Sequence, residues 1–251
     1  MRSLRVAHER KASTRVHNGR FTEKVAFITG AARGQGRAEA LRLAQEGADI
    51  IAVDIRRKLD STIYPGATQA DLKEAVRLVE ALGRRIVATA VDVRDFDSLS
   101  EALCAGVAEL GRLDVVIANA GISSANMSWE VRPEQWQETI DINLTGAFFT
   151  AKAAIPILID QGTGGCIVMT SSTAGLKGLP FCGHYVASKH GLVGLAKTMA
   201  SWAWAPERSA ADRVMTDVPL GRSAAPRLGS ILVYALFTVR NLGENVLSGG
   251  E

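Results

Sequence analysis

The chain has 251 residues and a mass of 26.7 kDa, and 47% of its residues are hydrophobic and 22% charged. This composition supplies a full core, which excludes global disorder and a fibrous protein. The net charge of +3 comes from the first twenty residues, which hold six Lys/Arg and one acid, so the nearly neutral remainder argues against a nucleic-acid surface.

Targeting and redox signals are weak. The longest apolar run, 231–239, is shorter than the ~20 residues that span a bilayer. The scattered Cys104, Cys166 and Cys182 have neither a disulfide nor a metal-ligand spacing. Residues 1–20 are basic and lack the apolar core of a secretory signal. We expect a cytoplasmic protein with a disordered arm or an over-early start, and a transit peptide is the alternative.

From Lys24 onwards, short apolar runs alternate with helical patterns. The expected strands are 25–29, 49–54, 85–91, 114–118 and 166–170. The expected helices are 37–46, 68–82, 96–110, 133–159 and 183–204. Gly47 closes the first helix as a C′ residue, and Thr68 with Asp71 forms a capping box for the second. The alternation predicts one doubly wound, Rossmann-like α/β domain with a parallel sheet of strand order 3-2-1-4-5.

A glycine-rich turn follows the first strand. Gly30, Gly34 and Gly36 let the backbone approach a pyrophosphate at a helix N-terminus, and Arg33 and Gln35 lie between them. In this strand-turn-helix context the turn predicts a nucleotide site.

Acidic and polar residues end the next strands. Asp54 can accept both ribose hydroxyls and would repel a 2′-phosphate, so it favours NAD over NADP. Arg33, Arg56 and Arg57 leave NADP open, because a guanidinium can pair with a 2′-phosphate. The remaining strand-end residues of the predicted cofactor site are Asp92, Val93, Asn119, Ala120 and Gly121.

Tyr185 and Lys189 share one face of the last predicted helix. A phenol with a pKa near 10 is a poor base at neutral pH, and a neighbouring ammonium favours its phenolate. Ser172 could bind a substrate oxygen, and Asn143 could hold a water that relays the proton. A lone Tyr–Lys pair is usually structural, but these four residues in this order predict alcohol–ketone chemistry.

The order of these motifs resembles the short-chain dehydrogenases/reductases over about residues 22–200. The insertion 55–68 with Tyr64-Pro65-Gly66 is similar to the mycofactocin-coupled branch, which includes carveol dehydrogenases, as are segments 30–37, 80–85 and 189–191.

The resemblance implies roles for the predicted residues. Tyr185 would be the acid/base, Lys189 would lower its pKa and bind the nicotinamide ribose, Ser172 would orient the substrate carbonyl, and Asn143 would complete the tetrad. It also implies a homotetramer, and an NAD that stays bound and is reoxidised in place by the redox peptide mycofactocin.

The resemblance fails after Ala200. We therefore divide the chain into the arm 1–20, the NAD-binding domain 21–205 and an atypical segment 206–251. A shifted frame, an internal deletion or divergence would explain this tail. We expect a disturbed far sheet edge, which 231–239 could cover as a substitute strand.

Two other functions stay open. One is an NAD(P)H carbonyl reductase with an exchangeable cofactor. The other is a catalytically impaired nucleotide-binding remnant with weakened oligomerisation. His184 and His190 are expected to contact neighbours or solvent, and Cys182 to be a plain apolar residue.

Overall fold

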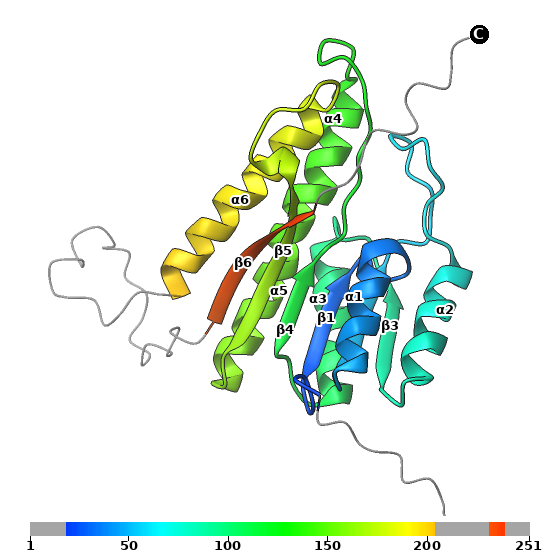
Figure 1. Ribbon diagram of the computed structural model, residues 1–251, viewed down its shortest axis with the longest axis vertical. Helices are drawn as coiled ribbons and strands as arrows, with labels where there is room; N and C mark the ends of the chain where they lie inside the picture. The colour runs from blue at the N-terminus through cyan, green and yellow to red at the C-terminus, as the bar shows by residue number, and fades with distance from the viewer. Residues whose placement is uncertain (1–18, 204–230, 239–251) are drawn as a thin grey trace, which may run out of the picture.

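The computed structural model describes residues 19–203 and 231–238. Six parallel strands form one sheet in the order β3-β2-β1-β4-β5-β6 (Figure 1). The strands are β1 (Val25–Thr29), β2 (Asp49–Asp54), β3 (Ile86–Ala90), β4 (Val115–Ala118), β5 (Gly165–Ser172) and β6 (Ile231–Thr238). The predicted strand order and doubly wound class are confirmed.

Helices cover both faces of the sheet. They are α1 (Gly34–Gln45), α2 (Gln69–Glu80), α3 (Phe96–Leu110), α4 (Pro133–Ile140), α5 (Gly146–Gln161) and α6 (Gly183–Ala203). A π-helical turn η1 (Asp141–Thr145) joins α4 to α5, and a 3-10 turn η2 (Thr173–Gly175) follows β5. α1 and α2 lie on one face, while α3, α5 and α6 lie on the other (Figure 1).

Alternating side chains of the central strands explain the two layers. In β1, Val25 and Phe27 belong to the core under α3 and α5, whereas Ala26 and Ile28 belong to the core under α1. Successive side chains of a strand point to opposite faces, so both faces of β1 are buried. This explains why the buried strands read as continuous apolar runs in the sequence.

Helix ends agree with the predicted caps in two places. Thr68 and Asp71 form the capping box of α2, and Gly47 follows α1 with a φ of +101°. The predicted start of α1 at Arg37 was three residues too late. Arg33 is the extended N-cap, so the glycine-rich turn already forms the first turn of the helix.

The predicted helix 133–159 is interrupted. Residues 141–145 form a π-helical turn, which often marks a functional position in a helix. By length and composition Pro133–Gln161 is long and apolar enough to cross a membrane, since an 18-residue window within it has a mean hydropathy of 1.5, a possibility missed by considering uninterrupted runs alone. Half of that window is buried inside the fold, as in a core helix that packs against a sheet.

The far edge of the sheet is covered. β6 pairs in parallel with β5 along Gly165–Ser172, so the predicted substitute strand is present. The predictions for residues 1–18, the rest of the atypical segment and the end of the last helix at residue 204 lie outside the described residues.

Candidate active site

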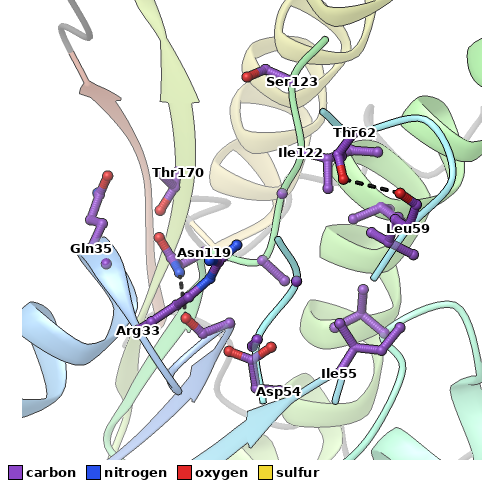
Figure 2. A pocket seen from close by; sticks show the side chains of 18 of the residues that line it. Arg33, Gln35, Asp54, Ile55, Leu59, Thr62, Asn119, Ile122, Ser123 and Thr170 are labelled. Carbon is purple, nitrogen blue, oxygen red and sulfur yellow. Dashed lines mark hydrogen bonds between the residues drawn. The ribbon is translucent and has the colours of Figure 1, made fainter. Parts of the chain in front are cut away.

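A cavity of about 530 Å³ crosses the carboxyl ends of the five strands β1 to β5. In Figure 2 the glycine turn and the insertion lie on opposite sides of Asn119. Most predicted cofactor residues line this cavity: Gly30, Arg33, Gly34, Gln35, Asp54, Asp92, Val93, Asn119, Ala120 and Gly121. The sheet therefore gathers residues from the ends of all five strands β1 to β5 into one site, as expected for an open parallel sheet.

The glycine turn is built for close backbone approach. Gly30 and Gly34 have φ values of +69° and +57°, which favour glycine. Gly36 does not line the cavity, but a Cβ there would lie 2.2 Å from the carbonyl oxygen of Gly30. Gly36 therefore sets the distance between α1 and the turn, while Gly30 and Gly34 form the wall.

Asp54 is a buried carboxylate at the end of β2 (Figure 2). Burial raises its pKa above the usual range, and this shift is opposed by the N–H of Ala32, which donates to Oδ2 at 2.8 Å, and by Arg33. One face of the carboxylate is thus held by the backbone while the residue lines the cavity. This arrangement suits the acceptance of ribose hydroxyls.

The three arginines near Asp54 differ in their surroundings. Arg57 forms an ion pair with Asp92 at 3.1 Å, and Arg56 donates to the side chain of Gln69. Arg33 lines the cavity, with its guanidinium 5.9 Å from the ring centroid of Tyr64. Of the alternative phosphate ligands, Arg33 and Arg57 line the cavity and Arg56 does not, and Arg57 is engaged by Asp92.

The ends of β3 and β4 are fixed by hydrogen bonds. Burial disfavours the ionised form of Asp92, but bonds from Arg94 outweigh it and hold the pKa below its usual range. The amide of Asn119 donates to the carbonyl oxygens of Thr29 and Gly30 at 3.0 and 3.3 Å. Asn119 thereby ties β4 to the glycine turn.

Three of the four predicted catalytic residues meet at the same cavity. Tyr185, Lys189 and Ser172 line it, and the ammonium of Lys189 lies 5.6 Å from the ring centroid of Tyr185. Lys189 Nζ also donates to the carbonyl oxygen of Thr170 at 2.7 Å. The Ser172 hydroxyl accepts from the N–H of Ala174 at 3.2 Å. An ammonium, a phenol and a hydroxyl in one cavity can transfer a proton to or from a substrate bound there.

Asn143 lies beneath the cavity and does not line it. Its side-chain oxygen accepts from the N–H of Ile122 at 2.7 Å, and its amide donates to the Ile122 carbonyl and to the hydroxyl of Ser188. The π-helical turn η1 carries Asn143 into this position. Its side chain thus orders the strand end after β4 and the helix between Tyr185 and Lys189, while its predicted part in a proton relay stays a prediction.

The insertion supplies a wall that sequence reasoning missed. Its cavity-lining residues are Ile55, Arg57, Leu59, Thr62, Tyr64, Gly66 and Ala67. The Tyr64 hydroxyl accepts from the N–H of Ser123 at 3.1 Å, and Ser61 is held by Glu138, which also pairs with Arg94 at 3.2 Å. Leu59 and Thr62 are buried, which is unusual for a loop and was not visible in a sequence segment without periodicity.

The flanking residues behave as expected. His190 is exposed, and His184 is fully buried against Ser124. Cys182 is buried outside the cavity, and burial raises the pKa of its thiol. None of these three residues lines the cavity.

The parallel sheet, the glycine turn at α1 and the strand-end carboxylate define a dinucleotide-binding α/β protein of the Rossmann type. The chain belongs to the short chain dehydrogenase family, whose model matches residues 24–206.

Named relatives agree with this assignment. The chain is 48% identical over 182 residues to a (-)-trans-carveol dehydrogenase of Rhodococcus erythropolis, and the match covers 72% of this chain and 66% of that protein. It is similar to a carveol dehydrogenase of Mycobacterium avium crystallised with NAD, at 52% identity and a TM-score of 0.72, covering 73% of this chain and 67% of that one. A short chain dehydrogenase of Mycobacterium paratuberculosis bound to NAD gives the same identity and TM-score, covering 73% of this chain and 68% of that one. The match thus spans just under two thirds of the length of this carveol dehydrogenase and of two further curated mycobacterial relatives.

Proposed function

We propose that this protein is an NAD-dependent oxidoreductase that interconverts a secondary alcohol and a ketone. One observation carries the proposal: the Tyr185–Lys189 pair and the Asp54 carboxylate line the same cavity. A proton-transfer group therefore lies in reach of a site suited to a dinucleotide. The naming of related proteins as NAD-dependent oxidoreductase and carveol dehydrogenase supports the same class of reaction.

The residues present fit NAD. The glycine turn leaves no side chain between the backbone N–H groups at the start of α1 and a pyrophosphate. Asp54 would accept the adenosine ribose hydroxyls and oppose a 2′-phosphate. Thr170 lines the cavity, and its hydroxyl oxygen is buried with no partner among the described residues, which leaves it available to a polar group of the cofactor.

The chain's own residues would handle the proton while the bound nicotinamide takes up the hydride. The phenol oxygen of Tyr185 would remove the hydroxyl proton of the alcohol, and the ammonium of Lys189 would stabilise the phenolate. The Ser172 hydroxyl would hold the substrate oxygen. Lys189 would in addition bind the nicotinamide ribose, a short movement from its position on the Thr170 carbonyl.

We further propose that this NAD is retained between turnovers and reoxidised in place by mycofactocin. The insertion supports this, since Tyr64 is hydrogen-bonded to Ser123 in the loop after β4 and Ser61 to Glu138 on α4. Release of the cofactor would require these bonds to break. NAD that stays with the purified protein after dialysis is the expected result, and ready loss of it would favour the carbonyl reductase with an exchangeable cofactor.

We also propose a cytoplasmic homotetramer, as the resemblance implies. Trp136 on α4 and Phe148 on α5 are both about two-fifths exposed, at 44% and 40%, and large apolar side chains of this kind are typical of a subunit interface.

The central test is Tyr185→Phe, which keeps the ring and removes the proton-transfer group. We expect alcohol oxidation to fall by at least about a hundredfold, the usual contribution of a general acid or base, with NAD binding retained. Tyr64→Phe is the comparison variant, since it removes a phenol that lines the same cavity but is used by Ser123: its rate of alcohol oxidation in a single turnover should be unchanged, although cofactor release becomes faster. Full activity in Tyr185→Phe would refute the mechanism.

A further inference from the structure

His184 is a fully buried polar side chain in the first turn of α6, directly before Tyr185. Its Nε2 atom lies 2.8 Å from the hydroxyl oxygen of Ser124. Burial lowers the pKa of His184, so the ring is neutral near pH 7. The ring does not line the cavity, so it has no direct contact with a cofactor or substrate there.

The hydrogen bonds around Ser124 assign the protons. The amide of Gln135 donates to the Ser124 hydroxyl oxygen at 2.9 Å, so the hydroxyl proton is left to donate to Nε2 of His184. The ring hydrogen then belongs to Nδ1. Among the described residues Nδ1 is buried with no hydrogen-bond partner, which is an unfavourable arrangement for a side chain that only fills space. The geometry indicates that this histidine holds the Ser124 hydroxyl in place through their hydrogen bond.

Ser124 connects His184 to the insertion. The residue before it, Ser123, donates its backbone N–H to the Tyr64 hydroxyl at 3.1 Å, and Ser123 and Tyr64 both line the cavity. A displacement of Ser124 would carry Ser123 with it, because the two share a peptide bond. Hydrogen bonds therefore link the first turn of α6 to the loop after β4, and link that loop to the insertion.

We propose that His184 is a positioning residue that holds the Ser123–Ser124 segment so that Tyr64 can close the insertion over the bound cofactor. This inference rests on the proposed binding of NAD. The ring of His184 takes no proton from the substrate; it acts through Ser124. The predicted property is slow release of cofactor, governed jointly by His184 and Tyr64, which do not bond to each other.

The test is a double-variant cycle on the full chain. The protein is loaded with NADH, mixed with excess NAD, and the loss of bound-NADH fluorescence gives the release rate. Tyr64→Phe and His184→Phe should each speed release about tenfold, the equivalent of about 1.4 kcal/mol. Because both changes break the same link, the double variant should stay within about threefold of either single variant. His184→Gln, which keeps an acceptor near the position of Nε2, should restore slow release to within about threefold of the unmodified chain.

His190→Phe is the matched control, an exposed histidine on the same helix whose ring, among the described residues, bonds to the Val186 carbonyl of that helix. Combined with Tyr64→Phe it should add nothing. If His184→Phe does not fold, Ser124→Ala breaks the same link from the loop side and replaces it in the cycle.

Three results would overturn the inference while NADH still binds: an unchanged release rate in His184→Phe, no rescue by His184→Gln, or effects of the two changes that multiply in the double variant. A merely structural histidine would lower the melting temperature and give such multiplying effects. A chain that binds no NADH would refute the proposed function together with this inference.

Discussion

The variant Asp54→Asn tests two things at once: whether the Asp54 carboxylate binds the cofactor, and how much this buried charge lowers the stability of the protein. The substitution keeps one oxygen in position to accept the N–H of Ala32, now at 2.8 Å from Oδ2, while the charge is removed and the second acceptor oxygen is replaced by an NH2 group. In the proposed complex both ribose hydroxyls donate to this carboxylate. A hydrogen bond to a charged group contributes about 1 kcal/mol more than a neutral one, so two of them give about 2 kcal/mol, or about thirty-fold weaker NAD binding. NADP should be affected less, because its 2′-phosphate is no longer repelled.

The same variant should stabilise the protein without its cofactor. Burial raises the pKa of Asp54, so the folded state binds the proton more tightly than the unfolded state does. The ionised carboxylate therefore lowers stability at neutral pH, and this penalty disappears below the carboxyl pKa of the unfolded chain. We expect Asp54→Asn to be more stable than the unmodified chain by about 0.5–2 kcal/mol at pH 7, a gain typical of relieving a functional site. The gain should shrink as the pH falls.

Calorimetric titration with NAD and NADP and thermal unfolding at pH 7 and pH 4 measure both effects. Asp60→Asn, an exposed acid in the insertion, is the charge-matched control and should leave both quantities unchanged. Unaltered NAD affinity in Asp54→Asn would show that the carboxylate does not bind the ribose. A lower melting temperature at pH 7 would show that the ion stabilises the fold, and the reasoning from burial would be wrong.

Three further outcomes are expected. Gly36→Ala should abolish tight NAD binding and destabilise the fold by about 1–3 kcal/mol, because its Cβ would overlap the Gly30 carbonyl; calorimetric titration and chemical denaturation measure both. Gly194→Ala, in the middle of α6 with no atom within 4 Å of the added Cβ, is its control and should stabilise the protein by about 0.5–1 kcal/mol in the same denaturation assay. Trp136→Glu should shift sedimentation from tetramer to smaller species with the far-ultraviolet spectrum unchanged, and a tetramer that survives would remove α4 from the proposed interface.

The sequence predicted the local elements well because their signals are local. The all-apolar runs of β1 and β2 require burial on both faces, which only a central position in a layered sheet gives. The position of the glycine turn was also predicted, since glycine readily adopts the positive φ that Gly30 and Gly34 have in the fold. Tyr185 and Lys189 lie four residues apart on one helix, so their meeting at one cavity was expected from the helical repeat.

Tertiary structure decided the rest, because those contacts join segments that no local pattern connects. The π-helical turn that places Asn143 under Ile122 depends on how α4 and α5 pack, and an apolar pattern of helical period does not reveal it. Tyr64 and Ser123 are 59 residues apart, and their contact depends on the path of a loop without periodicity. The sequence by itself thus determined the sheet, the glycine turn and the placing of Tyr185 beside Lys189. Only the folded chain decided that the insertion forms the wall of the same cavity, since loop closure is governed by long-range hydrogen bonds and burial.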